Sequence, residues 1–245
     1  MICAVMQPTY LPWCGYFDLI DSVDKFVFLD DVKLEKSDWH VRNKIKSANG
    51  DIMLTISVKL PNGRMETMIN QAELNFDKPW QKKHLKSIYI NYKKSPFFDS
   101  IYEFLEPLIL SNKSILSAYT ISIIKEISSL IGINTEFILA SEMYDIPGKK
   151  ETRLINICNK LNVNQYISPA GAVAYLEKNS SSELFANQGI KLYYHQYKHP
   201  IYDQLYGDFL SYLSIIDMLF NCGTEQTLKL IRNGHNIKGI TENGK

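Results

Sequence analysis

The chain has 245 residues, and 27 lysine and arginine residues nearly balance 26 aspartate and glutamate residues, for a net charge of +1. With 45% hydrophobic and 22% charged residues, it has the composition of a globular protein with a sizeable core, which excludes a disordered chain. The even charge balance argues against a general nucleic-acid binder, because binding through phosphates needs a basic surface.

The cysteines and the first residues point to a cytoplasmic protein. No cysteine belongs to a Cys-x-x-Cys pair, so the sequence offers no zinc or redox motif, and we expect reduced thiols. The start of the chain lacks the charged and apolar regions of a signal peptide. No apolar run reaches the ~20 residues that cross a bilayer, so we expect no membrane span.

The N-terminal residues predict the start of a strand–helix–strand unit. Residues 2–6 form a continuous apolar run that ends at Gln7-Pro8, which is typical of a parallel strand buried on both faces. We therefore expect this strand in the middle of a sheet. Apolar residues at helical spacing follow over 17–23, and residues 26–29 predict a second buried strand.

A hairpin and a helical section are predicted next. Asn49-Gly50 tolerates the positive φ of a tight turn, and it separates strand-like segments at 41–47 and 52–58. Apolar side chains at helical spacing then mark a section of about residues 78–131, whose last helix should end at Gly132.

Strands and helices alternate again in the second half. We expect strands at 137–140, 166–168 and 190–194, a helix at 151–161, and a helical tail of about 211–233 divided around Cys222-Gly223. Together these elements predict a single α/β domain over 1–245, with a three-layer, mostly parallel, Rossmann-like sheet and an inserted helical section. The order of the strands stays open.

The segment from Gln7 to Tyr16 follows the first strand directly and is the first candidate site. Its two prolines stiffen the loop, and Gly15 would bring the N–H groups of the next helix close to a phosphate. We interpret it as a ligand-binding loop, with an aromatic plug at the sheet edge as the alternative. Its candidate residues are Gln7, Tyr10, Trp13, Gly15 and Tyr16.

Two further candidates lie in the first quarter of the chain. Asp30 and Asp31 directly follow the second strand, where open α/β sheets place ligands, although they would also serve to cap a loop. Residues 39–44 combine cations that can hold a diphosphate with a tryptophan that can stack on a base; the alternative is a solvated hairpin strand. The candidates in this segment are Trp39, Arg42, Asn43 and Lys44.

The second half offers two candidate binding segments. Residues 149–153 place cations at a helix start, where the dipole disfavours them unless an anion binds nearby; a solvent-facing helix end is the alternative. Residues 168–175 combine small side chains between a strand and a helix, which suits either a close approach of a ligand to the backbone or tight packing. The candidates are Lys150, Arg153, Ser168, Gly171 and Tyr175.

Two of the five histidines, His195 and His199, lie at the end of the last predicted strand. Imidazole carries protons near neutral pH, so either could be a general base, with a hydrogen-bonded surface pair as the alternative. No third ligand accompanies them at metal spacing, and we expect no metal site.

These segments, in this order, resemble the WbqC-like family of bacterial proteins. The matching stretches span nearly the whole chain: 4–20, 23–32, 39–44, 84, 92–97, 150–154, 166–176, 199–202 and 213–223. The genes of this family lie in clusters for O-antigen and other surface or flagellar glycans, several of which carry 4-amino-4,6-dideoxy sugars acylated on nitrogen. The resemblance implies a transferase that forms an amide, such as a glycyl amide, on a nucleotide-linked amino sugar.

The resemblance also implies partners and roles. The partners are the nucleotide-linked amino sugar and an acyl or aminoacyl donor, which is an activated acid, a carrier-bound acyl group, or an acid with ATP; no nucleic acid is expected. His199 or His195, helped by Asp30 or Asp31, is the implied base, and His199 comes first because it lies beside Pro200 in the matching stretch. His84 and Tyr202 join the candidate substrate-binding residues.

A more distant likeness connects the N-terminus to nucleotidyltransferases of the His-x-Gly-His type. Trp13-Cys14-Gly15-Tyr16 falls at the motif, with the glycine present and both histidines absent, so adenylate chemistry by that route lacks its usual groups. Two other functions stay open: a glycosyltransferase or another nucleotide-sugar enzyme of the same pathway, in which Asp30-Asp31 would hold a divalent metal, and a non-catalytic partner of the glycan assembly machinery. In every case we expect the loop at 7–16, the aspartates and residues 168–171 to meet at one cleft.

Overall fold

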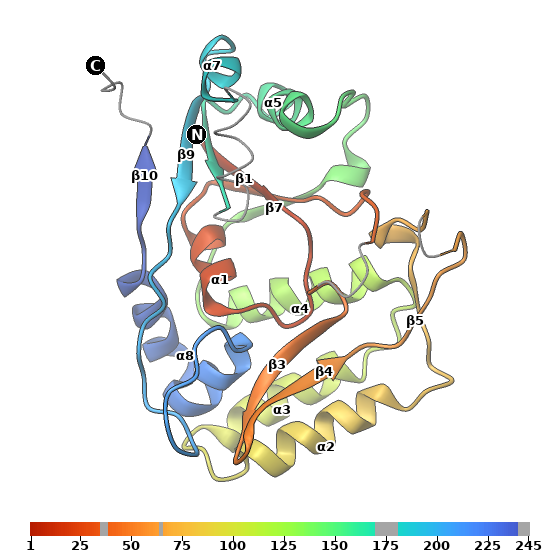
Figure 1. The fold of residues 1–245 in the computed structure, drawn as a ribbon, viewed down its shortest axis with the longest axis vertical. Coiled ribbons are helices and arrows are strands. Elements are labelled where there is room, and N and C mark those ends of the chain that lie inside the picture. Colours follow the sequence, from red (N-terminus) through yellow and green to blue (C-terminus); the bar gives the residue numbers. More distant parts are fainter. Residues whose placement is uncertain (35–38, 64–65, 170–180, 240–245) are drawn as a thin grey trace.

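A six-stranded sheet organises the computed structural model of the chain, which describes residues 1–34, 39–63, 66–169 and 181–239 (Figure 1). In spatial order the strands are β10 (Ile237–Gly239), β9 (Lys191–His195), β8 (Gln165–Ser168), β1 (Ile2–Met6), β2 (Lys25–Phe28) and β7 (Glu136–Leu139). All pairings are parallel except β9 with β10. The prediction that the first strand lies inside the sheet is confirmed, because β1 pairs with a strand on each side.

Helices cover both faces of the sheet, which confirms the predicted three-layer α/β fold. Successive side chains of β1 point to opposite faces. Ala4 packs into the core shared with α1 (Cys14–Asp21), α4 (Leu116–Leu130) and α8 (Ile215–Asn233). Cys3 and Val5 pack into a second core with α5 (Lys150–Lys160) and α7 (Ser181–Ala186).

The chain between β2 and β7 forms the inserted section. It contains the antiparallel hairpin of β3 (Arg42–Ser47) and β4 (Gly50–Thr55), and Gly50 adopts the positive φ that the Asn-Gly turn predicted. The short strands β5 (Val58–Lys59) and β6 (Glu73–Leu74) come next, separated by the 3-10 helix η1 (Ile69–Gln71). The helices of this section are α2 (Trp80–Tyr92), α3 (Phe98–Ile109) and α4, close to the expected residues 78–131.

The predicted division of the helical tail is confirmed at Gly223. This glycine interrupts α8 with φ 70° and ψ 179°, a backbone conformation that residues other than glycine rarely adopt. A Cβ atom there would also approach the ring of Phe97 to 2.7 Å. The elements that were not predicted include the edge strand β10, the short strand β6, the short helix α7 and the two 3-10 helices η1 and η2 (Ala140–Glu142).

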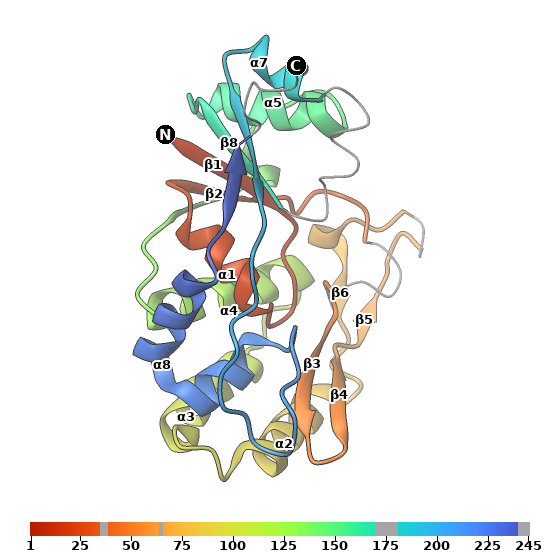
Figure 2. The same ribbon diagram turned by 60° about the vertical axis from the view of Figure 1, so that its left-hand side comes forward.

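The connection from β9 to α8, residues 196–214, has no regular secondary structure but lies against the hairpin. Figure 2 shows it running along the side of the molecule toward β3 and turning back into α8. Lys46, which is 2% exposed, fastens it by donating to Gln204 Oε1 (3.0 Å) and to the carbonyl of Asp208 (2.6 Å). Within the described residues, no helix is both long and apolar enough to cross a membrane.

Candidate functional site

The loop after β1 is held in place by side chains from the start of the hairpin. The Asn43 amide donates to the carbonyls of Tyr10 (3.2 Å) and Leu11 (2.6 Å), which stabilises the positive φ of 43° at Leu11. His40 Nδ1 donates to the carbonyl of Pro8 at 2.9 Å. Asn43 and His40, two of the four polar residues at 39–44, therefore hold the backbone of the predicted ligand loop in its conformation.

Trp13 closes over Gly15 at the start of α1. A Cβ atom on Gly15 would lie 2.3–2.6 Å from the indole ring, so only glycine admits this packing. The indole meets Tyr212 and Tyr197 with ring centroids 5.2 and 5.4 Å away, and the His199 ring stacks on it at 6.1 Å. The aromatic residues of the loop thus form a wall with the connection between β9 and α8.

Two cavities lie along this wall. The first, about 310 Å³, we call the histidine cavity, and it is lined by Met6, Trp13, Gly15, Tyr16, Leu19, Pro169, His195, Tyr197 and Tyr212. The second, about 270 Å³, we call the tryptophan cavity, and it is lined by Met6, Thr9, Pro12, Trp13, Tyr16, Trp39, Asn43 and Tyr212. They share four residues, so they are neighbouring parts of one site at the carboxyl ends of β1, β8 and β9.

A buried carboxylate–imidazole pair borders the histidine cavity. His195, at the end of β9, places Nε2 2.6 Å from Oδ2 of Asp18 on α1. The two side chains are 4% and 1% exposed. A carboxylate accepts hydrogen bonds, so Nε2 carries the hydrogen, and in the neutral form of the imidazole the lone pair is on Nδ1.

Asp18 was not among the residues predicted from the sequence, although a signal was present. It is the one acidic residue among Cys14–Ile20, every one of which is buried. An acid within such an apolar helical stretch needs a partner, because a buried charge is costly unless it is paired. The sequence does not reveal that this partner is a histidine 177 residues away.

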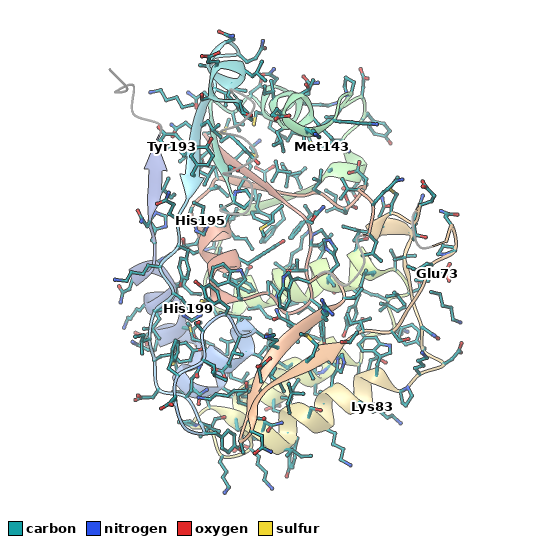
Figure 3. All side chains as sticks on the ribbon, viewed as in Figure 1. Glu73, Lys83, Met143, Tyr193, His195 and His199 are labelled. Carbon is teal, nitrogen blue, oxygen red and sulfur yellow. The ribbon has the colours of Figure 1, made fainter. Side chains whose placement is uncertain are left out.

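His199, the other candidate base, lies in a different setting from His195 (Figure 3). Its Nδ1 donates to the carbonyl of Pro200 at 2.8 Å, and its half-buried position lowers its pKa. Its ring packs among Trp13, Tyr202 and Tyr212. His195 therefore has a carboxylate partner at the cavity, whereas His199 contributes to the aromatic wall.

The predicted aspartate pair is engaged with neighbouring elements. Asp30 is 2% exposed and accepts from the backbone N–H and the hydroxyl of Ser141, after β7. Asp31 forms an ion pair with Arg153 of α5. Both follow β2 at the same sheet edge as the loop, but neither is among the residues that line the two cavities. The loop and Pro169 do meet at the histidine cavity, as predicted for the segments 7–16 and 168–171.

His84 supports the loop through a hydrogen bond with Tyr10. Its Nε2 donates to the carbonyl of Thr55 (3.1 Å), which leaves Nδ1 to accept from the hydroxyl of Tyr10 (3.0 Å). Burial lowers the pKa of His84 to about 4, so the ring is neutral at physiological pH.

The remaining predicted binding residues are spread around the site. The backbone carbonyl of Gln7 accepts a hydrogen bond from the Tyr16 hydroxyl (3.0 Å). Trp39 is half exposed and lines the tryptophan cavity. Lys44 pairs with Asp51 across the hairpin (3.0 Å). Arg42 begins β3, Lys150 begins α5, and Ser168 is fully buried at the end of β8. Gly171 and Tyr175 lie outside the described residues.

A buried polar network supports the aromatic wall. The carboxylate of Asp217 on α8 accepts from the hydroxyls of Tyr92 (2.7 Å) and Tyr202 (2.8 Å) and from the Gln204 amide (2.9 Å). Burial raises the pKa of Asp217. Tyr202, which the sequence suggested as a substrate-binding residue, thus fastens the connection that carries Tyr212.

The comparison with protein families covers most of this arrangement, from the loop after β1 into α8. Residues 7–229 match the WbqC-like protein family. The chain belongs to this family. A relative, the uncharacterized protein Rv1507c of Mycobacterium tuberculosis, is 33% identical over 224 residues, which cover 91% of this chain and 94% of that protein. No solved structure matches this WbqC-like protein.

Proposed function

We propose that this WbqC-like protein is a transferase that forms an amide on the amino group of an amino-dideoxy sugar, carried as a nucleotide sugar, for a bacterial surface glycan. The observation that carries the proposal is the buried Asp18–His195 pair beside the histidine cavity. Amide formation at neutral pH needs a base for the sugar ammonium, and a carboxylate-oriented imidazole is a suitable one.

The proposed chemistry assigns each proton and bond. Nδ1 of His195 accepts a proton from the sugar ammonium, and Asp18 stabilises the imidazolium that results. The free amine attacks the acyl carbonyl and forms the new C–N bond, while the bond from the acyl carbon to the leaving atom of the donor breaks. His195 then donates this proton to the leaving atom of the donor, and the second proton, which the nitrogen loses as the amide forms, is released to solvent. Such base assistance contributes about 10²–10⁴-fold to a rate.

The surroundings of the Asp18–His195 pair suit the other requirements of acyl transfer. α1 begins without a side-chain cap, and Gly15 lines the histidine cavity. The Tyr16 N–H already donates to the carbonyl of Trp13 (3.0 Å), so the Gly15 N–H is the donor that we assign to a developing oxyanion. The tryptophan cavity is mainly aromatic and apolar, and its Asn43 amide is already used by the loop. It suits an apolar acyl group or the apolar face of a deoxy sugar.

The glycosyltransferase alternative depended on a free aspartate pair. Asp30 is bound to Ser141 and Asp31 to Arg153, so both carboxylates already serve contacts between elements. No observation on the described residues favours that alternative over acyl transfer.

The test is incubation of the purified protein with a nucleotide-linked 4-amino-4,6-dideoxy sugar and candidate donors: acyl thioesters, or a free acid with ATP. Mass spectrometry of the nucleotide sugar reports the result. We expect an acyl or glycyl mass increment that depends on His195. Release of a nucleoside diphosphate without acylation would instead show glycosyl transfer, and would refute the proposal.

A further inference from the structure

The carboxylate of Asp18 contacts a second imidazole. His235, in the turn after α8, places Nδ1 3.2 Å from both Oδ1 and Oδ2 of Asp18. The Asp18 side chain is 1% exposed, whereas that of His235 is 43% exposed. One buried carboxylate therefore lies between an imidazole at the histidine cavity and an imidazole that solvent reaches.

Hydrogen-bond chemistry determines which atom of His235 carries the proton. The Ser22 hydroxyl donates to the backbone carbonyl of Asp18, so its oxygen can only accept from His235 Nδ1, 3.2 Å away. The carboxylate of Asp18 also only accepts. Nδ1 of His235 is therefore a donor, and Asp18 receives one N–H from each imidazole.

His235 lines a cavity of its own, which we call the His235 cavity. It has a volume of about 480 Å³, lies near the first residues of β1 and β8, and includes Ile2, Gln165 and the Asp21–Arg232 ion pair in its lining. None of the residues lining the His235 cavity lines the histidine cavity. The contacts His195–Asp18–His235 thus connect the histidine cavity with the His235 cavity.

We propose that His235 is a positioning residue that acts through Asp18 and that its protonation state determines how tightly His195 holds a proton. A neutral His235 takes up part of the hydrogen-bonding capacity of Asp18, and a cationic His235 neutralises its charge. Each effect weakens the support of Asp18 for a His195 imidazolium. That His195 is the base rests on the proposed function; the coupling between the rings does not.

Two other ionisable side chains face Asp18, and neither is charged near neutral pH. Cys14, from α1, and Tyr197, from the connection, face the carboxylate, and burial raises the pKa of both groups above their ordinary values. Both side chains therefore stay neutral below pH 8. Asp21 and Arg232 neutralise each other in a paired contact (2.7 Å).

The experiment is an NMR titration of His195 in the ¹⁵N-histidine-labelled full chain, which needs no substrate. His235→Leu removes the donor, and His235→Asn keeps an N–H near the position of Nδ1 but cannot titrate. We expect the His195 midpoint in His235→Leu to rise by about half a unit to one unit, and the midpoint in His235→Asn to lie between those of His235→Leu and the wild type. The double variant Asp21→Asn with Arg232→Gln, which removes a neighbouring ion pair without changing the net charge, should leave it unchanged.

An unchanged His195 midpoint in His235→Leu would overturn the proposal. His235 would then only hold α8 against α1, and its removal would lower the stability of the protein without changing the titration of His195. Should His235→Leu fail to fold, the wild type and His235→Asn carry the test: a His195 titration of the same shape and midpoint in both would overturn the proposal. Loss of transferase activity is a separate matter. If His195→Gln keeps full activity, the proposed function fails while the measured coupling stands.

Discussion

Replacing His195 with glutamine separates a proton-carrying role from a structural one. The amide nitrogen of glutamine can occupy the position of Nε2 and donate to Asp18, so the buried carboxylate keeps its partner. What disappears is the basic nitrogen of a residue that lines the histidine cavity. We expect turnover to fall by about 10²–10⁴-fold, which corresponds to about 3–5 kcal/mol of transition-state stabilisation. The free energy of unfolding should change by only about 1 kcal/mol, because the hydrogen bond is retained.

The assay follows the mass of the acylated nucleotide sugar under single-turnover conditions, with urea unfolding as the measure of stability. His199→Gln is the matched control, because it removes the other candidate base from the aromatic wall. If His199→Gln loses turnover by this factor and His195→Gln does not, His199 is the base and the assignment to His195 is refuted. If neither variant loses turnover, imidazole base catalysis at this site is refuted.

Four further expectations follow from particular contacts. Gly15→Ala should lower stability by about 1–3 kcal/mol and abolish most activity, because its Cβ would displace the Trp13 ring; urea unfolding and the acylation assay test this. Gly223→Ala should cost more stability than Gly189→Ala, since both positions have φ near 70° but only Gly223 faces a ring, at 2.7 Å; equal losses would contradict the steric argument. The pKa of His84 lies at about 4 when folded, below its ordinary value of 6.5, so the wild type should lose stability as pH falls from 6.5 to 4, by about 3 kcal/mol, and His84→Gln should remove that slope. The pKa of Asp217 is raised, so its contribution to stability is greatest at low pH and declines as pH rises through the folded pKa; the deficit of Asp217→Asn, about 1–3 kcal/mol at pH 7, should therefore grow on acidification.

Much of the architecture could be predicted from local sequence patterns. The continuous apolar run at 2–6 has the pattern of a strand covered on both faces, and β1 does lie between two parallel neighbours. Asn49-Gly50 marked the hairpin, and Gly223 marked the division of α8. These predictions succeed because periodicity, turn chemistry and glycine conformation depend on residues that are close together in the chain.

The candidate site depended on contacts between residues that are distant in the sequence. The loop at 7–16 was predicted as a binding loop and lines both cavities, but Asp18 was missed because its partner His195 belongs to the last parallel strand. Asp30, predicted equally as a ligand group or a loop cap, forms its hydrogen bonds with Ser141, after a strand 111 residues later. A carboxylate has the same sequence signature whether it faces a substrate, a serine or a histidine.

Sequence alone determined the class of fold, the family and the segment around which the site is built, because hydrophobic periodicity and motif order are properties of the chain itself. Only the tertiary structure decided the strand order, the edge strand β10 and the contact of two imidazoles with one buried aspartate. The physical reason is that strand pairing and burial bring together groups far apart in the chain, and the chemistry of each group is set by the neighbours it gains there.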